Sequence, residues 1–197
     1  MKRLIILLGV ALPVLFCSCS DEKDILPEQR EKLVSYLEKT HSPALIPEAS
    51  VGEDGQLPFY TTAGSTVYRH IVNYYRPNRE GSPEVTASSK VTITFRAYVF
   101  GYSNITDSTF PFYSNDPLLQ KDYEDLGLTP GAWPFEPRTI DMRSDILKGL
   151  WHALLGCREG DDVESYMTYN EAFGDKYFTT IPRESPVAWY FKVESVE

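Results

Sequence analysis

Few side chains in this sequence have the types and spacing that chemistry on a substrate requires. His41, His70 and His152 are far apart along the chain, and none has a Cys or a carboxylate beside it at the spacing of metal ligands. The acidic residues within 161–164 crowd one turn, which is typical of a solvated loop. The sequence has no Gly-rich phosphate loop and no G-x-S-x-G motif. We therefore expect no metal site, no cofactor and no covalent catalysis.

The sequence offers instead a short apolar helix that leads into an aromatic corner, in "DILKGLWHALLGCREGDDVESYMTYNEAFG", residues 145–174. Ser144 or Asp145 is expected to cap the start of the helix, and Gly156 to end it. A wide apolar stripe indicates that one face of the helix is buried. The stripe consists of Ile146, Leu147, Leu150, Leu154 and Leu155. Such a region binds by apolar contact rather than by making bonds.

The elements that must position this helix are strands. "LPFYTT", "STVYRHIVNYY" and "KVTITFRAYVFGY" are rich in β-branched and aromatic residues, as strands are. In the third, Val91, Ile93 and Phe95 alternate with polar residues, which predicts a half-buried strand. Shorter runs such as "RTIDM" and the C-terminal "VAWYFKVESV" complete the inventory. Five to six strands with one short late helix predict an α+β fold, in which a curved antiparallel sheet wraps around the helix.

Composition limits the kind of protein this can be. The chain has 197 residues, which suits one main domain. Aromatic residues make up 13% of it, in keeping with a β-rich fold. The formal net charge of −9, without clustered Lys and Arg, argues against nucleic acid as a partner. We expect a monomer.

The chain divides into a leader, a tether and a domain. Residues 27–41 have the spacing of a short amphipathic helix, and they lie within a tether and linker over 19–56. The main domain is expected over 57–197. Within it, 114–137 reads as an insertion, which is either a flap over a binding site, a contact surface, or a packed loop that covers the sheet edge.

The first residues resemble a bacterial lipoprotein signal. A basic start at Lys2 and Arg3 precedes an apolar stretch that is too short to span a bilayer, so residues 1–18 read as an export signal rather than as a buried helix. Cys19 follows the small Ser18, as in a lipobox, and is the expected lipidation site. Cys17 is the less favoured alternative. The resemblance implies export and a lipid anchor in the outer membrane, on its periplasmic or cell-surface face.

The residues around Cys19 indicate which side of the outer membrane the protein faces and whether it can form a disulfide. The acidic run 21–24 resembles a surface-export signal of some bacterial lipoproteins, and it reads equally well as a solvated tether. Once Cys17 is removed and Cys19 is lipidated, Cys157 remains alone, so no intrachain disulfide is expected. Its place at the end of an apolar helix predicts a small core residue.

The order of motifs in the C-terminal part resembles the FKBP-type peptidyl-prolyl isomerases, the immunophilin family. The matching pieces are "ILKGLWHALLGCREGDDVESYMTYNEAFG", then "IP", then "SPVAWYFKVESV". "VTITFRA" and "TFPFYSN" resemble earlier segments of the family more weakly. The resemblance covers residues 66–197, without the insertion at 114–137. It implies an FKBP-like fold with an apolar pocket for a prolyl peptide.

The resemblance also implies which residues line that pocket. Four match the family: Ile146 for a backbone amide that holds a ligand carbonyl, Phe112 for a wall, Ile181 for the rim, and Trp189 for the Phe of the last strand. Four positions depart from the family. Phe95 replaces a Tyr, and Tyr113 replaces an Asp. Leu150 replaces the Trp that forms the pocket floor, and Phe173 replaces the corner Tyr whose hydroxyl donates to the substrate. Trp151 is an alternative source of the missing floor ring. These aromatic residues also read as plain core.

Several functions remain open on the sequence. The first is a weak isomerase or folding factor that acts on prolyl polypeptides in the cell envelope. The second is a non-catalytic FKBP-like module that binds a peptide or a protein partner through a decayed pocket. A third, outside the family, is a surface protein that binds glycan or peptide through exposed rings.

Overall fold

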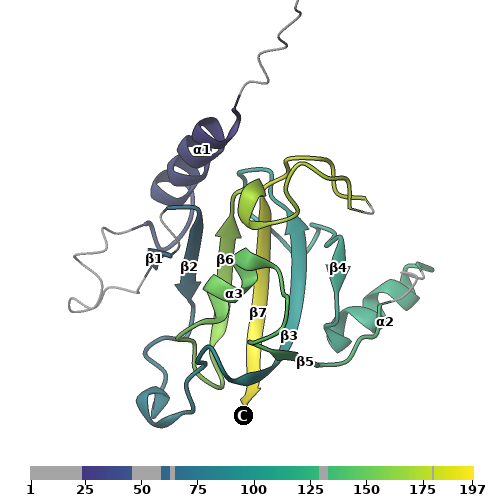
Figure 1. Cartoon of the computed structure of the whole chain (residues 1–197). Coiled ribbons are helices and arrows are strands. Elements are labelled where there is room, and N and C mark those ends of the chain that lie inside the picture. Colours follow the sequence, from purple (N-terminus) through teal and green to yellow (C-terminus); the bar gives the residue numbers. More distant parts are fainter. Residues whose placement is uncertain (1–23, 46–58, 63–64, 129–132, 179) are drawn as a thin grey trace, which may run out of the picture.

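An antiparallel sheet forms the centre of the computed structural model (Figure 1), which describes residues 24–45, 59–62, 65–128, 133–178 and 180–197. Every strand pair in it is antiparallel. The main path runs β1 (Phe59–Thr62), β2 (Val67–Ile71), β6 (Asp162–Met167), β7 (Val187–Val196), β3 (Lys90–Val99) and β4 (Tyr113–Ser114). The predicted α+β fold with an antiparallel sheet is confirmed. In the described part of the chain, no helix is long and apolar enough to cross a bilayer.

One edge of β3 is shared by two short strands, between which the predicted insertion leaves the sheet. β4 pairs with β3 near Arg96, and β5 (Arg138–Asp141) pairs with it nearer the start of the strand. The chain between them forms α2 (Pro117–Asp125), a helix that the sequence analysis did not predict. The Asp116 side chain caps α2 by accepting from the amide of Leu118 at 2.9 Å. Figure 1 shows α2 beside β4 and β5, at the outer edge of the sheet.

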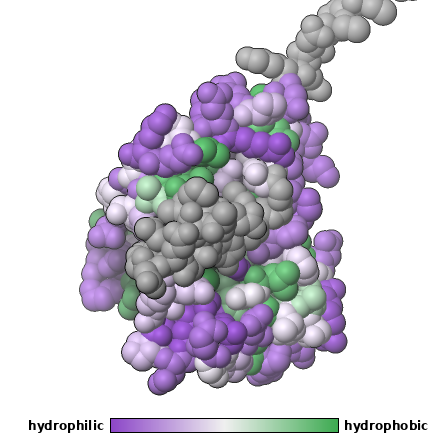
Figure 2. Space-filling model, turned by 90° about the vertical axis from the view of Figure 1, so that its left-hand side faces the viewer, coloured by the Kyte–Doolittle hydropathy of each residue, from purple (hydrophilic) through white to green (hydrophobic). Residues whose placement is uncertain are grey.

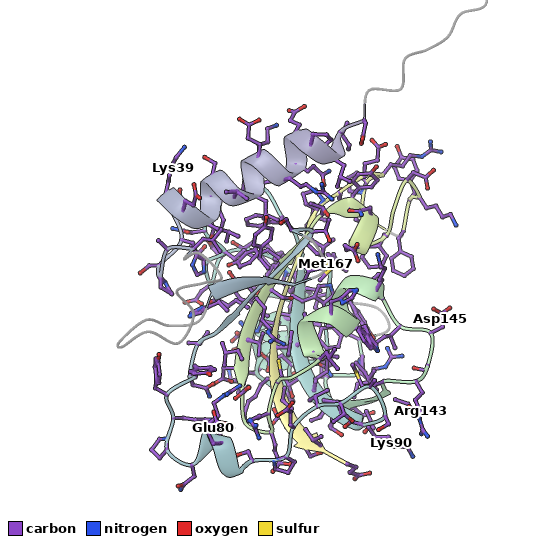
Figure 3. The ribbon with its side chains drawn as sticks, turned by 60° about the vertical axis from the view of Figure 1, so that its left-hand side comes forward. Lys39, Glu80, Lys90, Arg143, Asp145 and Met167 are labelled. Carbon is purple, nitrogen blue, oxygen red and sulfur yellow. The ribbon has the colours of Figure 1, made fainter. Side chains whose placement is uncertain are left out.

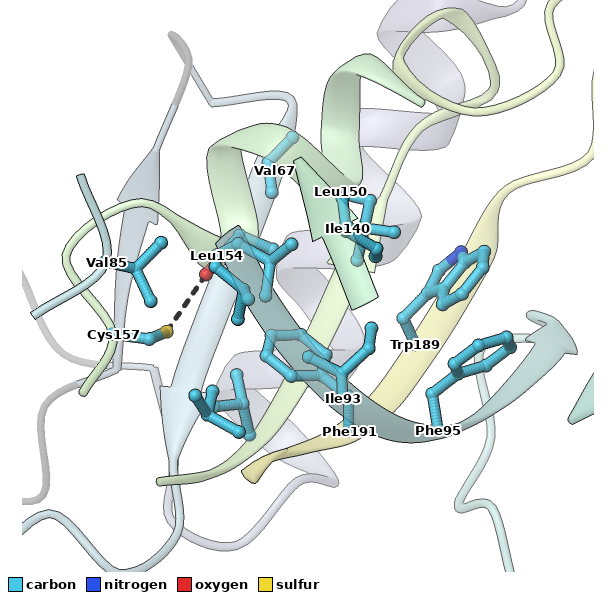
Figure 4. Close-up of a cluster of buried hydrophobic side chains, with 14 of the residues drawn as sticks. Val67, Val85, Ile93, Phe95, Ile140, Leu150, Leu154, Cys157, Trp189 and Phe191 are labelled. Atoms are coloured by element: carbon cyan, nitrogen blue, oxygen red, sulfur yellow. Dashed lines mark hydrogen bonds between the residues drawn. The ribbon is translucent and has the colours of Figure 1, made fainter. Parts of the chain in front are cut away.

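The helix α3 (Lys148–Leu154) packs on one face of the sheet, over the larger of two apolar clusters. Alternate residues of each strand point to this face, because side chains of a strand alternate between its two sides. From β3 these are Val91, Ile93, Phe95 and Ala97. Figure 4 shows this core, with Cys157 donating to the carbonyl of Ala153 at 3.2 Å. Cys157 is fully buried, as its place in the sequence predicted.

The opposite face of the sheet is covered by α1 (Leu26–Lys39), which confirms the predicted N-terminal helix. Leu33, Tyr36 and Leu37 are buried against the second apolar cluster, which includes Tyr68 and Tyr166 of the sheet. Figure 3 shows α1 across the upper end of the strands. The surface over the end of the molecule where α1 lies is mostly hydrophilic (Figure 2), as the amphipathic spacing of α1 requires.

The start of α3 differs from the prediction. The helix begins at Lys148, and its N-cap position is Leu147, without a side-chain cap. The hydroxyl of Ser144 is instead used in the turn after β5, where it donates to the carbonyl of Asp141 at 2.6 Å. The predicted capping by Ser144 or Asp145 was therefore wrong. Gly156 does follow the helix with a left-handed φ of 79°, as expected.

Two contacts hold α3 close to the segment after β6, the 3-10 turn η3 (Tyr169–Glu171). Lys148 donates to the buried carboxylate of Glu171 at 2.8 Å. Gly149 lies so close to this segment that a Cβ on it would stand 2.8 Å from the carbonyl oxygen of Glu171 and 2.5 Å from the sulfur of Met167. The approach of α3 to β6 therefore depends on the missing side chain of Gly149.

An apolar cavity as the candidate functional site

A cavity of about 640 Å³ opens on the α3 side of the sheet. Its walls are mainly aromatic and aliphatic, and α3, β3, β7 and the segments after β5 and η3 all contribute to it. All the residues predicted for the pocket line this cavity except Ile181. They are Phe95, Phe112, Tyr113, Ile146, Leu150, Phe173 and Trp189. Residues that are distant in the sequence are thus brought together as the family pattern expects.

The floor is formed by one residue from each of three elements. Leu150 of α3 is 4% exposed, and it lies above Phe95 of β3 and Trp189 of β7. The rings of Phe95 and Trp189 are 4.7 Å apart between centroids, and Figure 4 shows them at one end of the core. Trp151 does not take the place of Leu150, because it points toward β5 and its indole donates to the carbonyl of Met142 at 3.0 Å.

One wall is a row of phenyl rings, in which Phe173 and Phe178 follow η3 and Phe112 precedes β4. The ring of Phe173 meets that of Phe112 edge-on at 5.8 Å and stacks on Phe178 at 4.6 Å. Phe178 was missed by the sequence analysis, because it lies in an irregular segment where no periodic pattern marks a lining residue. Its exposed fraction of 49% leaves a phenyl face open at the mouth of the cavity.

The insertion supplies another part of the wall. Trp133 lines the cavity, with its ring 6.2 Å from that of Tyr113 and 5.3 Å from that of Tyr123 on α2. Trp133 therefore lies at the cavity, as expected if the insertion is a flap over the binding site. The helix α2 lies at the edge of the sheet, as expected if the insertion covers that edge. The pair of Arg96 with Asp116, at 2.6 Å, ties the start of α2 to β3.

Hydrogen-bond donors are scarce on the apolar part of the cavity wall. The amide of Ile146 donates to the carbonyl of Ser144 at 3.1 Å, so a ligand carbonyl has to compete with that bond. The buried indole N–H of Trp189 has no hydrogen-bond partner among the described residues. Tyr113 carries a hydroxyl into the lining, where Phe173 carries none. The cavity is thus suited to apolar ligands with one or two carbonyls.

Polar side chains of Arg138, Asp145 and Thr180 also contribute to the lining. Ile181 is not among the lining residues. It is 1% exposed, and its backbone exchanges hydrogen bonds with that of Phe178 at 2.8 and 3.3 Å.

The sequence analysis expected the three histidines to be far apart, but two of them meet in the structure. His41 and His70 lie on the face of the sheet opposite the cavity, with ring centroids 5.6 Å apart, beside Glu164. Burial alone would raise the pKa of Glu164, but hydrogen bonds from His41 and His70 hold it at about 2. The expectation was wrong because β2, β6 and the segment after α1 meet in space, which spacing along the chain does not reveal.

Comparison with known proteins places this architecture among the FKBP domains. No protein-family model and no curated protein sequence matches the chain. Solved structures do match it. The N-terminal domain of FKBP42 from Arabidopsis thaliana is 12% identical, with a TM-score of 0.50 over 72% of this chain and 94% of that one.

A bacterial protein gives a similar match over more of the chain. A peptidyl-prolyl cis-trans isomerase from Pseudomonas syringae pv. tomato is 11% identical, with a TM-score of 0.50 over 87% of this chain and 92% of that one. A multi-domain immunophilin from Arabidopsis thaliana, at 11% identity and the same TM-score, aligns with 78% of this chain and 48% of its own. The chain therefore has an FKBP-type fold.

Proposed function

We propose that this protein binds prolyl segments of polypeptides in the apolar cavity and acts as a weak peptidyl-prolyl isomerase or folding factor. The observation that carries the proposal is the joint lining of one cavity by Leu150, Phe95 and Trp189 in an FKBP-type fold. The proposal needs no cofactor. Its partners are unfolded or flexible chains that contain proline.

Isomerisation of a prolyl bond asks little of the side chains. Rotation about the bond faces a barrier of about 18–20 kcal/mol, because the planar amide is stabilised by resonance. The twisted amide has lost that resonance and is less well solvated by water than the planar form. A dry apolar cavity therefore favours the twisted amide over the ground state, which is the requirement for catalysis.

A second candidate is a binding module without catalysis. It is favoured by the loss of two groups from the family pattern: Leu150 supplies no indole to the floor, and Phe173 supplies no hydroxyl to the substrate carbonyl. A missing hydrogen bond of this kind typically removes about 0.5–1.5 kcal/mol, which slows isomerisation roughly 2- to 13-fold. The apolar contribution to binding remains in either case.

The two candidates are separated by isomerase rates on proline-containing peptides. We expect the purified protein to be slow, and the double variant Leu150→Trp with Phe173→Tyr to be faster. A matched control is Leu126→Trp with Phe110→Tyr, since both of these side chains are 64% exposed and lie outside the cavity lining. Peptide binding without turnover, even in the double variant, would favour the binding module. A wild-type rate equal to that of a competent isomerase would refute the idea that Leu150 and Phe173 have weakened the catalytic site.

We also propose that the protein is exported and held at the outer membrane by a lipid on Cys19. This proposal is supported by the sequence of residues 1–24, of which the structure describes only the last. Replacement of Cys19 by Ser should move the protein from the membrane fraction to the soluble fraction and abolish labelling by a fatty acid. Labelling that persists in Cys19→Ser and disappears in Cys17→Ser would assign the lipid to Cys17 instead.

A further inference from the structure

The face of the sheet opposite the cavity carries a cluster of nitrogen and oxygen ligands. His70 on β2 and Glu164 on β6 are direct partners in the strand register, so both side chains point to this face. His41, in the segment after α1, packs against Tyr36 of that helix and Tyr166 of β6, with ring centroids 5.9 and 5.7 Å apart. One atom from each of the three side chains lies within 4.8 Å of the others.

The geometry of His41 defines which of its nitrogens faces the cluster. Nδ1 is 2.6 Å from the carbonyl oxygen of Pro43, and a carbonyl only accepts, so Nδ1 carries a hydrogen. Nε2 then faces the carboxylate of Glu164 at 2.7 Å. Two such atoms stay at this distance only when a second proton lies between them, and a metal ion that displaced this proton would take its place.

We propose that His41, His70 and Glu164 form a binding site for a divalent transition-metal ion, with Zn²⁺ as the ion that fits best. Two imidazoles and one carboxylate suit Zn²⁺ and its neighbours in the first transition row, whereas Mg²⁺ and Ca²⁺ prefer oxygen ligands alone. Metal–ligand distances of about 2.0–2.2 Å in a tetrahedral site need ligand atoms roughly 3.3 Å apart. The 2.7 Å separation of His41 and Glu164 would therefore open by about half an ångström as the ion replaces the proton.

The surroundings resemble those of a metal site. The side chains of His41 and His70 are 6% and 4% exposed, and that of Glu164 is 25% exposed. The hydrogen bond from Nδ1 of His41 to a backbone carbonyl is the kind of outer contact that orients metal-binding imidazoles. Around Glu164, the hydroxyl of Tyr166 lies 3.4 Å from the carboxylate and 2.6 Å from the hydroxyl of Tyr190.

Of the three proposed ligands, Glu164 lines a groove on this face, whereas His41 and His70 lie outside its lining. The groove has a volume of about 770 Å³ and is lined by Glu164, Tyr190, Asp162 and Lys192, among others. An ion would therefore approach from the side of the carboxylate, whose side chain is 25% exposed. A bound ion would join the end of α1 to β2 and β6, so binding should stabilise the folded protein.

The test is a titration of the metal-free purified protein with Zn²⁺, and with Co²⁺ as a spectroscopic probe. We expect one ion per chain, a higher melting temperature with Zn²⁺, and cobalt absorption bands of tetrahedral intensity that added Zn²⁺ removes. His41→Gln, His70→Gln and Glu164→Gln should each weaken binding by more than the ~10–100-fold that loss of an outer contact costs. His152→Gln is the matched control, since His152 lies on α3 across the sheet, and it should bind as the wild type does.

Two results would overturn the proposal. One is wild-type protein that binds neither ion, which would show that a proton alone joins His41 to Glu164. The other is zinc binding that survives in His41→Gln and His70→Gln within twofold of the wild type. The wild-type cobalt spectrum tests the site without any variant. The proposal can therefore be refuted even if a variant fails to fold.

Discussion

Gly149 offers a direct test of how α3 is positioned over the sheet. Replacement of Gly149 by Ala adds one methyl group to the first turn of α3, which by propensity alone would stabilise the helix by up to about 1 kcal/mol. In this fold the added Cβ would stand 2.8 Å from the carbonyl oxygen of Glu171 and 2.5 Å from the sulfur of Met167. The sulfur belongs to a flexible side chain and can move, whereas the carbonyl is part of the backbone.

The net change in stability is set by the steric cost of the added methyl group, which exceeds the gain in helix propensity. Overpacking of a well-packed core costs typically about 1–3 kcal/mol, and here the conflict with the Glu171 backbone cannot be relieved by a rotamer change. Because a backbone conflict puts the cost in the upper half of this range, at about 2–3 kcal/mol, subtraction of the full propensity gain leaves an expected loss of about 1–2 kcal/mol in the free energy of unfolding of Gly149→Ala. For a domain of this size the melting temperature should fall by roughly 2–8 °C.

The assay is urea or thermal unfolding followed by circular dichroism, with Gly81→Ala as the control. Gly81 has nothing within 4 Å of its ideal Cβ, so its replacement should change stability by less than about 0.5 kcal/mol. If Gly149→Ala were as stable as the wild type or more so, α3 would not approach η3 and β6 as closely as described. That result would also undermine the geometry of Leu150 in the cavity.

Three further predictions concern other parts of the fold. Asp161 is fully buried and accepts two hydrogen bonds from Arg79, at 2.8 and 2.9 Å, so Asp161→Asn should cost about 3–5 kcal/mol of stability in urea unfolding; a cost below 1 kcal/mol would contradict this. Burial raises the pKa of the Cys157 thiol, so a thiol reagent should label it only in the unfolded protein; rapid labelling of folded protein would disagree. Trp133→Ala should weaken prolyl peptide binding severalfold, since a ring of the cavity wall is lost, and unchanged affinity would remove the insertion from the site.

The sequence was informative where a pattern is local. The spacing of Leu33, Tyr36 and Leu37 predicted α1, and the alternation in 91–96 predicted β3, because burial on one face imposes a period that can be read directly. The order of motifs also predicted which aromatic residues gather around α3. The first two signals depend on neighbours within a few residues, whereas the third depends on resemblance to a family over residues 66–197.

The sequence was uninformative where competing contacts decide the result. Ser144 has the chemistry of a helix cap, but its hydroxyl is used by the turn after β5, so α3 starts later. The helix α2 lies among prolines and glycines that obscured its short pattern. The meeting of His41 with His70 depends on packing between α1 and the sheet, which no spacing along the chain encodes.

The central claim is that the cavity beside α3 accepts a prolyl segment. It is tested most directly by titrating isotopically labelled protein with a short proline-containing peptide and mapping the NMR shifts by residue. We predict that the largest changes fall on Leu150, Phe173 and Trp189, with exchange between the cis and trans peptide signals accelerated if the protein is also catalytic. An absence of shifts around the cavity at saturating peptide, or changes confined to the opposite face near Tyr190, would contradict the claim.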